Sequence, residues 1–359
     1  MILNVATLAS LGADITRLGI VLEPNGDPSE AEGVLNPGTA RSRDGKLLVY
    51  PRAVAAGNVS RIGLVEASGP ADSPRFTRIG FALEPVAPYE VRTGPGGYGC
   101  EDPRVTFLPL LDRYVMAYTA FGPDGPRIGV ALSRDGYEWE RLGLMDFSGP
   151  GLATGDDKDG VFFPEAVRSP AGVWSFALYH RPMRHVVAID VCAAAPIVLA
   201  KPPHERECTR IAYVPVEPVL DDRRHLLRVA ESALVLEPGP DWGLIKNGAG
   251  TPPVRIAEGW LSFYHGVDVH AGKNGQCLGM SYRGGLLVHD LESPHIVRYV
   301  SPAPLLAPKT VEERFGTVND VVFPTGLDIR PGAPERDFDL YYGMADSKIG
   351  RARVRLSAD

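Results

Sequence analysis

The sequence has no run of about 18 apolar residues, the length that a membrane-spanning helix requires. It has no excess of basic residues either, and its formal net charge of −7 argues against nucleic-acid binding through a basic surface. The mildly apolar residues 1–12 carry no basic start, and Asp14 and Arg17 soon follow them. This is not the pattern of a signal peptide. We therefore expect a cytoplasmic protein with no membrane or nucleic-acid partner.

Cysteine is scarce, and its four copies show no Cys-x-x-Cys spacing. The spacing predicts neither a zinc site nor a disulfide framework, so we expect reduced or buried thiols, no metal and no cofactor. The four residues are Cys100, Cys192, Cys208 and Cys277.

Long amphipathic helical periods are also scarce, whereas the 359 residues include 40 glycines and 33 prolines. This composition is typical of many short strands joined by turns. Length alone suggests roughly two domains, but all-β folds often run longer and no linker divides the chain. We predict one all-β catalytic domain over residues 1–359.

A tyrosine-rich segment recurs five times, and a segment containing proline precedes each copy. The tyrosine-rich segments are 47–52, 114–120, 174–182, 260–266 and 338–346, and the proline segments are 36–40, 101–105, 163–167, 250–254 and 323–326. Five copies of one plan predict five sheets around an axis, a five-bladed β-propeller, and the alternative is a sandwich with chance similarity. Each proline segment should begin an innermost strand, and residues 1–20 should supply a closing strand.

Polar residues from all five repeats would then converge near the axis. One is Asp102, in the unusual stretch Glu101-Asp102-Pro103-Arg104. Because neighbouring side chains on a strand point to opposite faces, we expect Asp102 to face the channel and Glu101 to face away. The alternatives are a turn whose acids cap a loop and ordinary surface salt bridges. The other converging residues are Asn36, Arg52, Arg104, Lys158, Asp159, Arg181, His265 and Asp346.

An ordered set of short stretches between about residues 33 and 350 resembles glycoside hydrolase family 130, the β-mannoside phosphorylases and related β-mannosidases. The matching stretches are Asn36-Pro-Gly, Gly99-Cys-Glu-Asp-Pro-Arg-Val-Thr, Tyr118-Thr-Ala-Phe, Lys158-Asp-Gly-Val-Phe-Phe-Pro-Glu, His180-Arg-Pro, Gly248-Ala-Gly-Thr-Pro-Pro-Val, Gly259-Trp-Leu-Ser-Phe-Tyr-His-Gly-Val, Asn319-Asp-Val-Val-Phe-Pro-Thr-Gly and Tyr341-Tyr-Gly-Met-Ala-Asp. The resemblance implies a five-bladed propeller, in agreement with the repeats.

The resemblance also implies roles. Asp102 would be the proton donor. A cluster of Lys158, Arg181 and His265 would hold inorganic phosphate, with Arg127 as a further candidate in less similar surroundings. The mannosyl unit would be bound by Asn36, Arg52, Arg104, Asp159 and Asp346. Tyr50-Pro51-Arg52 departs from the expected Tyr-Arg and blurs which sugar contact Arg52 makes.

The residue types favour phosphorolysis over hydrolysis. An inverting hydrolase needs a second carboxylate about 6.5–9.5 Å from the acid to activate water. A phosphorylase instead needs cations and fixed donors for an anionic nucleophile. We therefore predict an inverting phosphorylase that acts on a β-mannoside or manno-oligosaccharide and phosphate and yields mannose 1-phosphate.

Two alternatives stay open, and so does the state of assembly, with a homo-oligomer among the choices. The first is an inverting β-mannosidase with Glu165 or Glu231 as the base. The second is a non-catalytic carbohydrate-binding propeller, with Tyr98, Trp242 and Tyr264 stacking on sugars.

Overall fold

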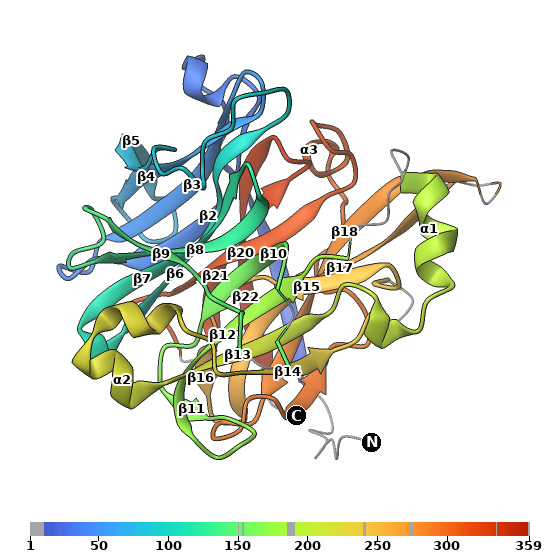
Figure 1. Ribbon diagram of the computed structural model, residues 1–359. Helices are drawn as coiled ribbons and strands as arrows, with labels where there is room; N and C mark the ends of the chain where they lie inside the picture. Colours follow the sequence, from blue (N-terminus) through green and yellow to red (C-terminus); the bar gives the residue numbers. More distant parts are fainter. Residues whose placement is uncertain are drawn as a thin grey trace.

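The computed structural model describes residues 11–357 apart from 150, 153, 185–190, 240–241, 273, 275 and 335. The protein is all-β, as the sequence predicts, and the described helices are short and lie at the periphery (Figure 1). None of the described helices is long and apolar enough to cross a membrane. The α-helices are α1 (Val191–Leu199), α2 (Val216–Asp221) and α3 (Val311–Arg314), and the 3-10 turns are Pro28–Glu30, Pro109–Leu111, Pro203–Glu205 and Arg223–Leu227.

Within the described ranges the strands fall into five antiparallel groups of four, which form four hydrogen-bonded sheets. The eight-stranded sheet contains two of these groups, joined where two residues of β4 pair in parallel with two of β6. Group one is β2 (Gly33–Arg41), β3 (Leu47–Ala55), β4 (Val59–Ser68) and β5 (Arg75–Leu83); group two is β6 (Tyr98–Leu108), β7 (Arg113–Gly122), β8 (Gly125–Ser133) and β9 (Glu140–Leu144); group three is β10 (Asp157–Phe162), β12 (Trp174–Pro182), β13 (Thr209–Pro215) and β14 (Glu231–Leu236); group four is β15 (Lys246–Ala249), β17 (Gly259–Ala271), β18 (Cys277–His289) and β19 (Val297–Val300); group five is β20 (Val322–Ile329), β21 (Asp337–Met344), β22 (Lys348–Ser357) and β1 (Gly12–Leu22).

Two short strands, β11 (Val167–Arg168) and β16 (Val254–Ile256), pair with the second strands of groups three and four. Strand β1 pairs with β22 from Gly12 opposite Ser357 to Leu22 opposite Ile349. The N-terminal segment therefore supplies the fourth strand of group five, although residues 1–10 lie outside the described part.

The tyrosine repeat marks the second strand of every group, where its side chains are part of the core. Each of these tyrosines is at most 1% exposed. They are Tyr50 in β3, Tyr118 in β7, Tyr179 in β12, Tyr264 in β17 and Tyr341 in β21. The repeat therefore arises because each group buries a tyrosine of its second strand in the core.

The prolines do not begin the innermost strands, and that expectation was wrong. Pro37, Pro103 and Pro324 lie inside β2, β6 and β20, where the pairing with the next strand shifts register. A bulge is where an interior strand tolerates proline, because the extra residue interrupts the hydrogen-bond ladder. The bulges also re-aim the neighbouring side chains, and this positions the site.

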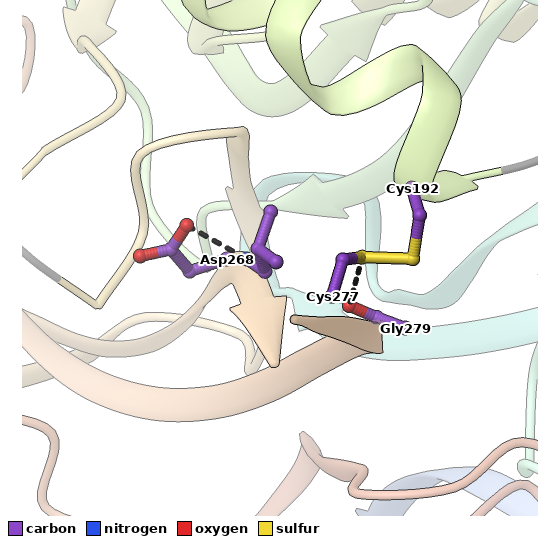
Figure 2. The surroundings of a disulfide bond; sticks show 5 residues. Cys192, Asp268, Cys277 and Gly279 are labelled. Atoms are coloured by element: carbon purple, nitrogen blue, oxygen red, sulfur yellow. Dashed lines mark hydrogen bonds between the residues drawn. A yellow bond between two sulfur atoms is a disulfide. The ribbon is translucent and has the colours of Figure 1, made fainter. Parts of the chain in front are cut away.

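The four cysteines do not share one state. Cys192, in the first turn of α1, forms a disulfide with Cys277, the first residue of β18, with Cα atoms 5.7 Å apart (Figure 2). The expectation of thiols was wrong for this pair, because a separation of 85 residues gives no local signal of contact. Cys100 and Cys208 are buried thiols as expected, and burial raises the pKa of Cys208 to about 11.

Candidate functional site

The first cluster of the site is built around Asp102, and its members come from three strand groups. Asn36 Nδ2 donates to Asp102 Oδ1 at 2.9 Å, and Arg52 Nη1 lies 3.3 Å from the same oxygen. Lys158 Nζ lies 3.6 Å from Asp102 Oδ2. Asp102 itself is 5% exposed. A buried carboxylate is thus surrounded by one amide and two cations.

A left-handed backbone creates this arrangement. Asn36, Asp102 and Asp159 have φ angles of 45°, 48° and 60°, and each sits at the register shift of the first strand of its group. Asparagine and aspartate tolerate this conformation better than other non-glycine residues. Each of three groups therefore has a bulge of the same kind, and each bulge orients one short polar side chain.

The bulge overturns the expected orientation of Glu101. Its Oε1 accepts from Arg52 Nη2 at 3.0 Å, and its Oε2 lies 3.4 Å from Lys158 Nζ. Glu101 and Asp102 therefore share the same two cations instead of pointing to opposite faces. The alternation rule failed because the positive φ of Asp102 breaks the period of two within β6.

The carboxyl groups near Arg52 differ in proton affinity. Burial would raise the pKa of Asp102, but Lys158, Arg52 and Arg104 together hold it well below its usual range. Asp346, in the turn between β21 and β22, has φ 48° and is half-buried. Burial raises the pKa of Asp346 to about 6 despite the opposing effect of Arg52. Asp102 is therefore ionised at neutral pH, whereas Asp346 takes up a proton at a pH not far below neutral.

The second cluster is built around Asp159. Arg181 Nε donates to Asp159 Oδ2 at 2.7 Å, and His265 Nε2 lies 3.7 Å from that oxygen. Burial lowers the pKa of His265 to about 3, with Arg181 acting in the same direction, so the ring is neutral at physiological pH. The sequence predicted a third cation here, but the burial that neutralises a histidine cannot be read from a motif.

Arg104 lies between the two clusters. Its Nη1 donates to the backbone oxygen of Asp102 at 2.7 Å, and its Nε donates to that of Gly250 at 3.1 Å. The guanidinium lies 5.2 Å from the centre of the Phe323 ring. Burial lowers the pKa of Arg104, against the charges of Asp159 and Asp102. One buried arginine thus interacts electrostatically with both acids.

Three buried polar atoms in this region have no hydrogen-bond partner among the described residues. They are Asn36 Oδ1, Arg104 Nη2 and His265 Nδ1. Buried polar groups in native proteins are nearly always paired, so unpaired ones at one site indicate a polar ligand. All three residues belong to the predicted site.

Gly248 leaves space at the same place in group four. A Cβ atom on this residue of β15 would collide with the Asp159 carboxylate and with the His265 ring. Groups one to three place Asn36, Asp102 and Asp159 at this position of the first strand. Group four has Gly248 there, and the side chains of Asp159 and His265 occupy the space that a larger residue would need.

A model of glycoside hydrolase family 130, described as beta-1,4-mannooligosaccharide phosphorylase, matches residues 223–357. The chain is 26% identical over 262 residues to a 1,2-beta-oligomannan phosphorylase of Thermoanaerobacter sp. (strain X514), covering 72% of this chain and 69% of the relative. It is 28% identical over 264 residues to the beta-1,4-mannooligosaccharide phosphorylase of Ruminococcus albus, covering 71% and 62%. These matches make the chain similar to glycoside hydrolase family 130, the family that its sequence motifs resemble.

Solved structures of family 130 share the fold. The beta-1,2-mannobiose phosphorylase of Listeria innocua, in complex with beta-1,2-mannobiose, superposes with a TM-score of 0.69 at 21% identity over 95% of this chain and 97% of that one. A family 130 structure from work on glycoside hydrolases that target beta-1,2 mannosidic linkages in Candida mannan has a TM-score of 0.69 at 20% identity over 98% and 96%. Phosphorylases and hydrolases thus share one fold, which does not separate the two reactions.

The structure places other predicted residues of the chain apart from the two clusters. Arg127, on the third strand of group two, forms an ion pair with Asp156 at 2.6 Å. Trp242 and Tyr264 are buried and pack on each other, with ring centres 5.3 Å apart, so neither forms a sugar platform. Tyr98 is partly exposed at the start of β6.

Neither acid that the sequence offered as a hydrolytic base reaches the clusters. Glu165 is 47% exposed and pairs with Arg255 at 2.9 Å. Glu231 begins β14, the last strand of group three, and accepts from the backbone of Ala171. Both residues are near motifs that carry the resemblance, but neither lies on the first strand of a group.

Sequence reasoning missed Glu207, Lys246 and Tyr282. The Glu207 carboxylate contacts Arg181 Nη1, and Arg181 and Lys246 hold its pKa below the usual value despite burial. Lys246 Nζ lies 5.6 Å from the centre of the Tyr282 ring, which is 5.9 Å from that of His265. Lys246 precedes the Gly248 motif by two residues and could have been found from its place on β15. Glu207 lies near the end of the long connection between β12 and β13 and has no such signal.

Proposed function

We propose that this chain is an inverting β-mannoside phosphorylase. A phosphate oxygen forms the new bond to the anomeric carbon while the glycosidic bond breaks and a proton passes to the leaving sugar oxygen. The products are mannose 1-phosphate and a sugar shortened by one unit. The observation that carries the proposal is a buried acid, Asp102, set among the basic residues Arg52, Lys158 and Arg104 from three strand groups.

In this reaction Asp102 is the proton donor, and phosphate binding supplies its proton affinity. Lys158, with its side chain 20% exposed, is a cation of the Asp102 cluster that an anion can reach. A phosphate dianion beside Lys158 offsets the positive field and raises the pKa of Asp102, because a nearby negative charge disfavours ionisation. Phosphate is thus the nucleophile, and by its charge it also raises the proton affinity of the acid.

The remaining roles follow from position. Lys158 and Arg181 bind phosphate as cations, and neutral His265 donates a hydrogen bond. Arg127 is the least supported phosphate ligand because it is paired with Asp156. The mannosyl hydroxyls are bound by Asn36, Arg52, Arg104, Asp159 and Asp346. The unpaired Asn36 Oδ1 and Arg104 Nη2 are atoms that a sugar hydroxyl would satisfy.

We propose that the five strand groups are the blades of a five-bladed propeller and form one domain over residues 1–359. First strands of neighbouring groups contact each other: β2 touches β6 and β20, and β10 touches β6 and β15. The acids at the centre of the two clusters, Asp102 and Asp159, lie on two of these strands, β6 and β10. A central channel lined by first strands would bring the residues of the two clusters to one mouth.

Hydrolysis is the second candidate, and Glu207 is the observation that favours it. Its side chain is 15% exposed and its carboxylate occupies Arg181, the cation predicted to bind phosphate. A hydrolase requires a second acid to activate water, and Glu207 is an acid in contact with the Asp159 cluster. Glu207 therefore replaces Glu165 and Glu231 as the candidate base.

The deciding experiment compares sugar release from β-1,2- and β-1,4-mannobiose with and without inorganic phosphate. We expect turnover only with phosphate, and mannose 1-phosphate of inverted, α configuration as the product. Equal rates in both conditions, with free mannose as the product, would contradict phosphorolysis and support hydrolysis with Glu207 as the base.

A cytoplasmic location stays a prediction, because phosphorolysis conserves bond energy only where the cell can use the sugar phosphate. The disulfide between Cys192 and Cys277 weighs against it, since such bonds persist mainly in oxidising compartments. Thiol trapping in fractionated cells would decide: labelled Cys192 and Cys277 in the cytoplasmic fraction support the prediction.

A further inference from the structure

A groove of about 580 Å³ lies between groups four and five. One wall is the outer half of the β17–β18 hairpin, and the other is the segment 304–320 that leads into β20. Its volume is within the roughly 300–1,000 Å³ typical of small-molecule sites. The residues that matter here are His270, Leu278, Arg283, Arg314, Phe315 and Asp320.

Both walls of the groove connect to the candidate site. On the hairpin, Tyr282 donates its backbone N–H to the Asp320 oxygen at 3.0 Å, while its ring stacks beside His265. On the opposite wall, Val318 N donates to the oxygen of Ala345, the neighbour of Asp346, at 3.2 Å. Backbone hydrogen bonds therefore join both walls of the groove to residues that are next to the candidate site.

The lining combines an exposed apolar surface with polar groups in fixed positions. Phe315 is 67% exposed and Leu278 is 56% exposed. Arg283 and Arg314 form no ion pair among the described residues, whereas His270 Nδ1 is held 2.6 Å from Asp320 Oδ2. An aromatic face beside planar hydrogen-bond donors matches a pyranose, which has an apolar face and a rim of hydroxyls.

The hairpin that forms one wall is fixed covalently. Cys277, which precedes Leu278, is bonded to Cys192 in α1 (Figure 2). A wall that is held in place before the ligand arrives loses less entropy on binding.

We propose that this groove binds the leaving-group sugars of an oligosaccharide, beyond the unit attached to the scissile bond, and that it selects substrates longer than a disaccharide. The proposal rests on the proposed function, because it assigns the groove to the part of the substrate that is released. Phe315 is the stacking platform, and Arg283 and Arg314 donate to sugar hydroxyls.

The test compares kcat/KM for mannobiose and mannotetraose of the same linkage, with phosphate saturating. We expect the wild-type protein to prefer the tetrasaccharide. Phe315→Ala should lower kcat/KM for the tetrasaccharide by about tenfold, the size of a lost aromatic stacking contact, and change the disaccharide value less than threefold. Phe81→Ala is the matched control, because Phe81 is 41% exposed on β5 in group one.

Equal losses on both substrates would overturn the proposal, and so would a change of oligomeric state in Phe315→Ala with unchanged chain-length preference, which would assign the groove to a second copy of the chain. If the wild-type protein releases no sugar phosphate, the proposed function fails while the groove remains testable. Mannotetraose binding to the wild-type and Phe315→Ala proteins, measured by calorimetry, then decides, and equal affinities refute the groove.

Discussion

Asp102 and Asp159 occupy the same bulge in the first strands of neighbouring groups, yet their surroundings differ. Asp102 faces its cations Arg52 and Lys158 at 3.3–3.6 Å, whereas Asp159 receives a 2.7 Å bond from Arg181. Arg181 is bound in turn by Glu207. The proton affinity of Asp102 can therefore respond to a ligand, while that of Asp159 is fixed by its own ion pair. The same bulge thus presents a proposed proton donor, Asp102, in group two and an ion-paired carboxylate, Asp159, in group three.

The largest effect should come from removing the proton of Asp102. We expect Asp102→Asn to lower kcat by about 10²–10⁴-fold, the usual contribution of a general acid, because the amide cannot protonate the leaving oxygen. Asn36 can still donate to the remaining carbonyl oxygen, so the fold and sugar binding should persist. Steady-state kinetics and thermal unfolding measure both quantities.

Glu101→Gln is the matched control, because Glu101 contacts the same two cations as Asp102. If charge alone supports the reaction, both variants should be equally impaired. Activity of Asp102→Asn within a few-fold of wild type would remove the proton-donor role.

Asp346 should behave oppositely to Asp102 in stability. Its folded-state pKa of about 6 lies above its usual value, so the folded protein binds more protons than the unfolded chain between about pH 4 and pH 6. Its contribution to stability is therefore fully present below pH 4 and is lost as the pH rises through 6. Asp346→Asn removes this loss and should stabilise the protein by on the order of 2 kcal/mol at pH 8, with little change at pH 4.

Urea unfolding at the two pH values measures this difference. Asp102→Asn in the same experiment should destabilise at pH 8, because a lowered pKa marks a charge that stabilises the folded state. The same free-energy change for Asp346→Asn at pH 4 and pH 8 would contradict the assignment.

Much of the fold was legible because it repeats. The five tyrosine segments predicted the second strand of every group, and the all-β class followed from composition and repeats. The site was legible where a residue belongs to a repeated segment, as with Asn36 and Asp102. Alternation misplaced Glu101 because a positive φ is a local backbone choice that the residue pattern does not reveal.

Features that depend on distant contacts could not be predicted. Glu207 reaches Arg181 only after a long connection that contains α1, and Cys192 meets Cys277 across 85 residues. The neutral state of His265 depends on complete burial, which several groups create together. Burial and long-range pairing are properties of the packed chain, so a single sequence shows them poorly.

Glu207→Gln sharpens the comparison most directly, because it changes the Asp159 cluster without touching Asp102. In a phosphorylase the Glu207 carboxylate competes with phosphate for Arg181. Replacing it with a neutral amide should lower the phosphate KM by about tenfold, since a charge-assisted contact is worth roughly 1.5–3 kcal/mol and a decade costs about 1.4 kcal/mol. The KM for the mannoside should stay within about twofold.

Glu165→Gln is the control for this substitution, because Glu165 is exposed and bonded to Arg255 on the surface. It should change neither KM, since its charge is screened by solvent. In a hydrolase Glu207 is instead the base, so Glu207→Gln would abolish phosphate-independent release of mannose rather than improve phosphate binding. The two reactions predict opposite signs for one substitution: a gain in activity at low phosphate means that Arg181 binds the phosphate anion, and a loss means that Glu207 acts as the base.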